Sequence, residues 1–349
     1  MDRRDFFHPG KISKGMEPAK ELLEKQLPKP RLQESQLIRF SRKAMGTVFE
    51  WTFPFGLPDI HNLANKSFDL IDHLEGLLSA YQPTSEVCRI NRDGPLGNWQ
   101  TLSEPLWQLC THSKKLWLQT TGAFDPTMGS LIQAWGFLRG PFRVPIQTEI
   151  DSILNNAGMQ RIEYHPTQRQ IKHHGSEANW NFGAIGKGFA IDYAAKWLSS
   201  RLPNASFLLH SGRSSIYSKG DSPSEELGWV VQVNHPLSGE SMAKLRLKDG
   251  ALGTSATTYK KFEVAGKTYG HVLDPRSGYP SNGLDSATVF APDSATADAL
   301  STAVFVSGME LAEKLTMDNP SLGFLLLEKT KGERPIVLGA MKDILVPIE

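Results

Sequence analysis

The sequence contains few cysteines, almost no net charge and no long apolar run. Its 349 residues include two cysteines, Cys88 and Cys110, without a Cys-x-x-Cys spacing, which argues against a disulfide framework and a metal–thiolate site. The formal net charge is +1, so the composition gives no reason to expect nucleic acid or a membrane surface as a partner. No apolar segment is long enough to cross a bilayer. With 40% hydrophobic residues, the chain is expected to build a sizeable core.

The first 36 residues differ from the remainder. Arg3 and Arg4 begin a segment that resembles a twin-arginine export signal, but the residues that follow are charged and contain proline, with no apolar stretch. No cysteine near the start offers a site for a lipid anchor. We expect residues 1–36 to be a flexible or peripheral extension and residues 37–349 to form the domain. The cytoplasm is the favoured location, and export is the alternative.

The pattern of apolar residues predicts an α+β fold. Helical spacing favours helices over 58–78, 103–119 and 294–307. Strands are expected over 37–55, 206–210, 229–234, 244–247, 261–264, 268–273, 287–291 and 322–327. Between Trp229 and Asp274 the predicted strands follow one another without helices, which favours antiparallel pairing over a doubly wound sheet.

The predicted helix 294–307 carries a candidate metal site. Asp298 and Thr302 are four positions apart, so their oxygens project from the same helix face, which we expect to be exposed. Mg²⁺ binds oxygen ligands and often needs only one or two side chains beside substrate phosphates. The alternative is an ordinary polar helix face, with Ser294 or Thr296 as the N-cap.

A turn rich in glycine opens a second helix within residues 181–192. Gly183, Gly186 and Gly188 allow a ligand to approach the backbone, and Lys187 adds a positive charge. A helix start of this kind favours anions. The spacing matches neither a Walker A loop nor a dinucleotide fingerprint. The turn is therefore either a phosphate site or a place where glycines permit close packing and Lys187 is solvated.

Several separated segments resemble one known family. They are Met45-Gly46-Thr47, Ser79-Ala80-Tyr81 with Ser85-Glu86-Val87 and Asn91, Thr121 to Gly129, Trp135-Gly136-Phe137, Gly183 to Asp192, Thr254-Ser255, His271 to Pro280, and Ala297 to Thr302. In this order they resemble the ApbE-type FAD:protein FMN transferases. The resemblance implies an α+β fold with mixed or antiparallel sheets, flanking helices and an FAD cleft between two lobes.

The resemblance also implies a reaction and its residues. FMN would pass from FAD to a threonine hydroxyl of a partner protein, with Mg²⁺ as cofactor and AMP as product. The FAD site would be lined by Met45, Tyr81, Ala123, Phe124, Asp125, Asn181, Lys187 and Val272. Mg²⁺ would be held by the carbonyl oxygen of Ala184 and by Asp298 and Thr302.

Lys187 and His271 are the catalytic candidates. A lysine beside a pyrophosphate stabilises charge on the phosphoryl oxygens, and His271 is placed to take the proton from the incoming hydroxyl. For each candidate a plainer alternative stays open. His271 could be a hydrogen-bonded strand residue, Asp274 could simply shape a turn, and Tyr81 and Phe124 could belong to the core.

The chain departs from the family pattern at three places. Asn181 stands where an aspartate is usual, residues 213–216 replace a glycine-containing segment, and Ala256 replaces a glycine. The last change matters if that position needs a positive φ. Two alternatives to the transferase therefore remain: a Mg²⁺-dependent FAD pyrophosphatase, in which water is the acceptor, and a flavin-binding protein without turnover.

Overall fold

A large antiparallel sheet forms the middle layer of the computed structural model, which describes residues 37–212, 214–223, 227–257, 261–329 and 334–347. Its eight strands, in spatial order, are β1 (Leu37–Ala44), β2 (Thr47–Pro54), β6 (Phe207–Ser211), β7 (Ser215–Lys219), β10 (Gly250–Ala256), β13 (Leu284–Ala291), β14 (Gly323–Glu328) and β15 (Ile336–Gly339). All neighbouring strands in this sheet are antiparallel.

Three small antiparallel sheets accompany the large one. They consist of β3 (Gln100–Thr101), β5 (Gln170–His173) and β4 (Ile162–Tyr164); of β8 (Trp229–Asn234), β9 (Ser241–Leu247) and β16 (Leu345–Val346); and of the hairpin β11 (Lys261–Val264) and β12 (Lys267–Gly270). Val231 and Leu245 of the second of these sheets pack with Leu252 and Leu325 of the large sheet. The large sheet is thus covered on one face by strands.

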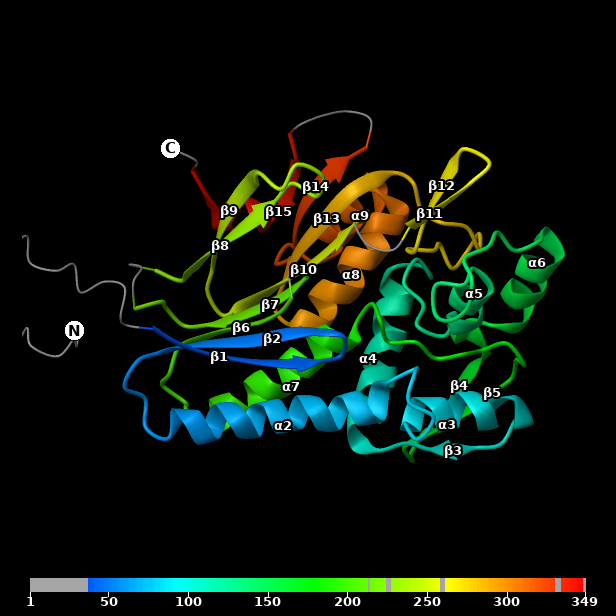
Figure 1. Cartoon of the computed structure of the whole chain (residues 1–349), viewed down its shortest axis with the longest axis horizontal. Helices are drawn as coiled ribbons and strands as arrows, with labels where there is room; N and C mark the ends of the chain where they lie inside the picture. The colour runs from blue at the N-terminus through cyan, green and yellow to red at the C-terminus, as the bar shows by residue number, and fades with distance from the viewer. Residues whose placement is uncertain (1–36, 213, 224–226, 258–260, 330–333, 348–349) are drawn as a thin grey trace, which may run out of the picture.

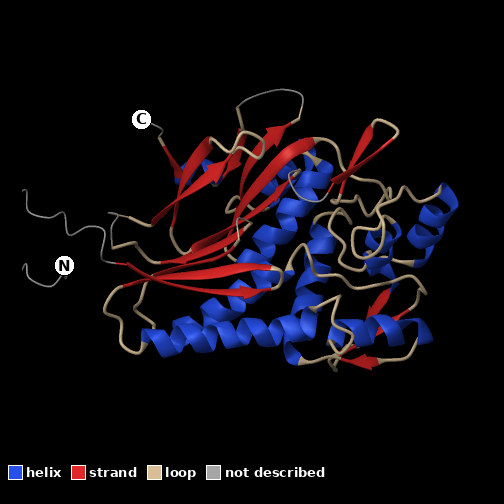
Figure 2. Ribbon diagram, viewed as in Figure 1, coloured by secondary structure: helices blue, strands red, loops and turns tan. Residues whose placement is uncertain are grey.

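Helices cover the other face of the large sheet (Figures 1 and 2). On this face lie α2 (Ile60–Leu78), α7 (Gly186–Arg201) and α8 (Ser294–Ser307). The other helices are α3 (Glu86–Asp93), α4 (Glu104–Gln119), α5 (Gly129–Ala134), α6 (Gln147–Asn156), α9 (Met309–Asp318) and α10 (Met341–Ile344), of which α10 packs with the small sheet on the opposite face. Helix α8 contacts β10 and β13, α7 contacts α8, and α2 contacts α7. Helices α7 and α8 therefore lie closest to the middle of the sheet.

Buried aromatic residues join α2 to the sheet. Trp51 of β2 stacks on Phe68 of α2 with ring centroids 4.9 Å apart, and its indole N–H donates to the buried Ser67 hydroxyl at 2.8 Å. Ile71 and Leu74, on the same side of α2, are fully buried. Burying each such side chain contributes roughly 1.5–3 kcal/mol, so this apolar stripe stabilises the layer on which α7 rests.

The α+β prediction and the antiparallel pairing are confirmed. Helix 294–307 has the expected bounds, but its N-cap is Asp293, whose carboxylate accepts from the Thr296 amide. The prediction of Ser294 or Thr296 as N-cap is therefore wrong. The expected strand 37–55 is a hairpin that turns at Met45 and Gly46, and the expected strand 268–273 ends at Gly270.

The predicted extension 1–36 lies outside the described residues. None of the helices in the described part of the chain is both long and apolar enough to span a membrane.

Candidate functional site

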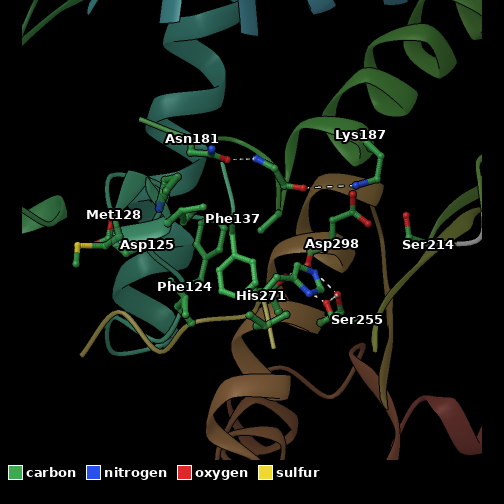
Figure 3. Close-up of a pocket in the computed structure, with 18 of the residues that line it drawn as sticks. Phe124, Asp125, Met128, Phe137, Asn181, Lys187, Ser214, Ser255, His271 and Asp298 are labelled. Carbon is green, nitrogen blue, oxygen red and sulfur yellow. Dashed lines mark hydrogen bonds between the residues drawn. The ribbon is translucent and has the colours of Figure 1, made fainter. Parts of the chain in front are cut away.

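A cavity of about 590 Å³ opens where the large sheet meets the helical part of the chain. Its walls come from the β1–β2 turn, the segment from Ala123 to Leu138, the glycine turn before α7, the ends of β7 and β10, α8, and the residues that follow β12. Every site residue expected from the sequence lines this cavity: Met45, Tyr81, Ala123, Phe124, Asp125, Asn181, Ala184, Lys187, His271, Val272, Asp298 and Thr302. Residues far apart in the sequence are thus brought into one cavity (Figure 3).

The glycine turn is shaped by Asn181. The Gly183 amide donates to the Asn181 side-chain oxygen at 2.9 Å, and the Asn181 amide donates to the Pro126 carbonyl at 2.7 Å. The Lys187 ammonium group lies 3.4 Å from the Gly183 carbonyl oxygen. Asparagine serves this turn as an aspartate would, because the turn uses one side-chain oxygen as an acceptor.

Asp298 is buried, with 6% of its surface exposed, so the expectation that it is exposed is wrong. Its Oδ2 accepts from the Gly188 amide at 2.8 Å and from the Ser215 hydroxyl at 2.9 Å. Burial raises the pKa of Asp298 to about 6, and the nearby charge of Lys187 opposes this rise. In Figure 3 the side chains of Lys187 and Asp298 point toward one another. These contacts hold a carboxylate at one end of the cavity.

Thr302 lies one turn of α8 beyond Asp298. Its hydroxyl lies 3.2 Å from the Ser255 hydroxyl, which in turn lies 2.9 Å from the Ser301 hydroxyl. Ser255 belongs to β10, so this strand contacts the threonine, whose hydroxyl also lies 3.4 Å from the Asp298 carbonyl oxygen. A carboxylate, a hydroxyl and the Ala184 carbonyl are hard oxygen donors of the kind that Mg²⁺ binds. No group of three or more histidine, cysteine, aspartate or glutamate side chains that could hold a metal occurs among the described residues. The residues present therefore fit a magnesium ion that shares its coordination with substrate phosphates.

His271 follows directly after β12 and lies in the cavity wall. Its ring packs against Phe137 with centroids 6.4 Å apart and planes 70° apart. His271 lies outside the strand that the alternative expected, because β12 ends one residue earlier. Figure 3 shows the imidazole beside Ser255, between Phe137 and α8. His271 is thus on the wall that joins the aromatic end of the cavity to the end that carries Asp298.

Asp274 shapes a turn, as its plainer interpretation proposed. Its carboxylate accepts from the Arg276 amide and from the Arg276 Nε, both at 2.9 Å, and its carbonyl accepts from the Gly278 amide at 2.8 Å. Asp274 is not among the residues that line the cavity. Asp125 does line it, but the Asp125 carboxylate is also occupied by the amide and hydroxyl of Thr127 and by the Met159 amide.

Two aromatic side chains face the cavity from loops. Tyr81 is 53% exposed, which excludes a core role, whereas Phe124 is 2% exposed and also packs in the core. Arg139 donates to the Tyr81 carbonyl at 2.7 Å, and its guanidinium lies 5.9 Å from the centre of the Tyr81 ring. Sequence reasoning did not assign roles to Arg139 or to Phe137. Arg139 gave no signal, because its contact with Tyr81 joins loops that are distant in sequence.

Of the remaining departures from the family pattern, one has no structural consequence. Ala256 lies in β10 in an extended conformation and does not have a positive φ. Ser214 lines the cavity, and Ser215 holds Asp298. The latter role was missed because β7 itself was not expected. Arg213 lies outside the described residues.

Comparisons with known proteins agree on one family. The sequence model described as the ApbE family matches residues 45–326. The FAD:protein FMN transferase of Escherichia coli K12 is 29% identical over 281 residues, which cover 78% of this chain and 79% of that protein. The protein of that name from Chlamydia trachomatis is 29% identical over 255 residues, which cover 71% of this chain and 77% of the relative.

Solved structures show the same fold. The ApbE protein of Thermotoga maritima superposes with a TM-score of 0.78 at 28% identity, covering 86% of this chain and 97% of that one. The flavin transferase ApbE of Vibrio cholerae superposes with a TM-score of 0.78 at 24% identity, covering 88% and 99% of the two chains.

Proposed function

Because the chain belongs to the ApbE family, we propose that it transfers FMN from FAD to a threonine hydroxyl of an acceptor protein, with Mg²⁺ as cofactor and AMP as the second product. The observation that carries this proposal is the single cavity in which Lys187, His271, Asp298 and aromatic side chains meet. Its volume of about 590 Å³ lies in the range of roughly 300–1,000 Å³ typical of cofactor sites. The relatives are named for the transfer of FMN from FAD to a protein, which supports the general reaction.

Residues in different parts of the cavity have different proposed roles. Tyr81 and Phe124 offer ring surfaces on which an aromatic ligand stacks. Lys187 places a positive charge where the pyrophosphate would lie, close to the Gly183 carbonyl and to Asp298. Asp298, Thr302 and the carbonyl of Ala184 would hold Mg²⁺, which when bound neutralises charge on the phosphoryl oxygens. Substrate binding and charge stabilisation thus take place at opposite ends of one cavity.

His271 is the residue proposed to move a proton. The acceptor hydroxyl oxygen forms a bond to the phosphorus of the FMN half, and the bond from that phosphorus to the bridging oxygen breaks. The hydroxyl proton passes to the imidazole of His271, and AMP leaves with the bridging oxygen. This assignment needs the imidazole to be neutral before the attack, as a general base must be.

The proposal is tested by incubating the purified chain with FAD and Mg²⁺, with and without an acceptor that contains an Asp-Gly-x-Thr segment. We expect AMP release together with an FMN-sized mass gain on the acceptor. An acceptor with that threonine changed to alanine, and a reaction with chelator, are the matched controls. AMP and free FMN without acceptor would instead identify a pyrophosphatase, and bound FAD without any AMP would identify a flavin-binding protein.

A further inference from the structure

Helices α7 and α8 cap each other near the cavity. In α7, Gly188 and Asp192 are four positions apart and share one face of the helix; in α8 the same holds for Ser294 and Asp298. The Gly188 amide donates to Asp298 Oδ2 at 2.8 Å. In return, the Ser294 amide donates to Asp192 Oδ1 and the Ala295 amide donates to Asp192 Oδ2, each at 2.8 Å. Each helix therefore supplies a carboxylate to the unpaired amides at the start of the other.

The backbones meet so closely at this crossing that no side chain fits between them. A Cβ atom on Gly188 would lie 2.2 Å from the Ser294 carbonyl oxygen and 2.8 Å from the Ala295 nitrogen. A Cβ atom on Gly253 of β10 would lie 2.3 Å from the Ala297 carbonyl carbon on the other side of α8. The start of α8 is thus held between α7 and the sheet, with no free space at either contact.

The surroundings of Asp192 disfavour its ionised carboxylate. Burial raises its pKa to about 8, and the like charge of Asp293 adds to that rise. The two helix amides and the positive end of the α8 dipole oppose it by favouring the ionised form. A carboxylate with both oxygens engaged by one helix start is suited to hold that helix in place. Asp192 itself does not line the cavity.

We propose that Asp192 is a positioning residue, which fixes α8 against α7 so that Asp298 and Thr302 stand at the correct distance from the glycine turn and Lys187. Lys187 precedes Gly188, and Gly188 is the residue that bonds Asp298. The reciprocal caps therefore connect the charge and the oxygen ligands of the two helices through one rigid crossing. This inference rests on the proposed function for the role of the metal, but the geometry it describes exists without FAD or metal.

The experiment compares Asp192→Asn with Asp293→Asn. Asparagine keeps the shape of Asp192, but its NH2 group replaces one of the two oxygens that accept here, so in this arrangement it accepts from only one of the two amides. Asp293 caps the same start of α8 through Thr296, but it makes no hydrogen bond to α7. Both variants weaken the start of α8, and only the first loosens its link to α7. The thermal midpoints of both variants are measured to show that each folds.

The first readout is hydrogen exchange of the Gly188 amide in the chain without FAD or metal. This amide lies on α7 and does not bond the Asp192 side chain. We expect Asp192→Asn to speed its exchange about tenfold, as expected for the loss of one buried hydrogen bond that holds α8 against α7, and Asp293→Asn to change it less than about twofold. Equal exchange in the two variants would overturn the proposal, because Asp192 would then act only as a cap of α8.

The second readout is the affinity for Mn²⁺ in the presence of FAD, followed by electron paramagnetic resonance. We expect Asp192→Asn to bind Mn²⁺ about tenfold more weakly than the unchanged chain, with Asp293→Asn within about twofold of it. An unchanged affinity in Asp192→Asn would contradict the positioning role. If the unchanged chain released no AMP, the proposed function would fail, while the exchange of Gly188 would still decide on Asp192.

Discussion

At the α7–α8 end of the cavity the walls are backbone, short side chains and Lys187, whereas the other end includes aromatic side chains carried by loops. The first end leaves less than a methyl group of free space at Gly188, and its carboxylate is buried. At the second end Tyr81 is half exposed and held by Arg139. Under the proposed function, the charged part of the ligand would be placed by closely packed helices, while the aromatic part would meet side chains carried by loops.

The largest effect is expected at the rigid end. Asp298→Asn removes the charge but keeps the shape, so AMP release should fall by about 10³-fold or more, since a metal contributes several kcal/mol to such a step. Turnover at saturating FAD is measured over a range of Mg²⁺ concentrations. The variant should stay folded, which circular dichroism checks. Undiminished Mg²⁺-dependent turnover in Asp298→Asn would contradict the assignment of Asp298 as a metal ligand.

His271 lies between the two ends, and its loss should slow the chemical step while the binding of FAD is little affected. We expect His271→Ala to reduce the rate of AMP release about 10²- to 10⁴-fold at saturating FAD. His210→Ala is the matched control, because His210 is a half-buried histidine of β6 that does not line the cavity. A rate equal to that of the control would remove His271 from the mechanism.

Adding a methyl group at a glycine tests whether the crossing of α7 and α8 is packed more tightly than the rest of the helix. Gly188→Ala should lower the free energy of unfolding by about 1–3 kcal/mol, since the added carbon has no space between α7 and α8. Gly186→Ala, two residues earlier in the same helix, should change stability much less, because its nearest neighbour would be the Phe182 Cβ at 3.5 Å. Denaturant unfolding measures both. Equal losses would show that the crossing is not the constraint.

The smallest effect is expected at the aromatic end. Tyr81→Ala should weaken FAD binding about five- to tenfold, which corresponds to about 1 kcal/mol for one partly exposed ring. Phe55→Ala is the control, since Phe55 is 72% exposed and lies outside the cavity. Fluorescence quenching of the flavin measures both dissociation constants. If Tyr81→Ala weakened FAD binding by as large a factor as Asp298→Asn slows AMP release, the proposed difference between the two ends would be wrong.

The sequence predicted the elements whose pattern is local. Helix α8 was found because its apolar residues repeat and no proline or glycine interrupts it, and strands such as Trp229–Asn234 have the alternation of a half-buried sheet. Asp298, Thr302 and Lys187 were candidates from their spacing and chemistry, and the family resemblance supplied most of the other candidate site residues in order along the chain. Their meeting in one cavity follows from the fold.

Elements set by distant contacts were missed. Strand β10 begins Gly250-Ala251-Leu252-Gly253, and glycines give a segment weak strand character. Gly253 is needed because α8 lies so close that a larger residue would not fit there. The burial of Asp298 was missed for the same reason, because the residues that bury it belong to β7 and α7, which are distant from α8 in the sequence. A single helix pattern shows which side chains share a face, but not what packs on that face.

The most direct test of the account is to locate a metal at the α7–α8 end. Crystals of the chain grown with FAD and Mn²⁺, measured for anomalous scattering, should show one manganese bound by the Asp298 carboxylate, the Thr302 hydroxyl and the Ala184 carbonyl, beside the FAD pyrophosphate. Manganese on the pyrophosphate but away from Asp298, or at another place in the chain, would contradict the account.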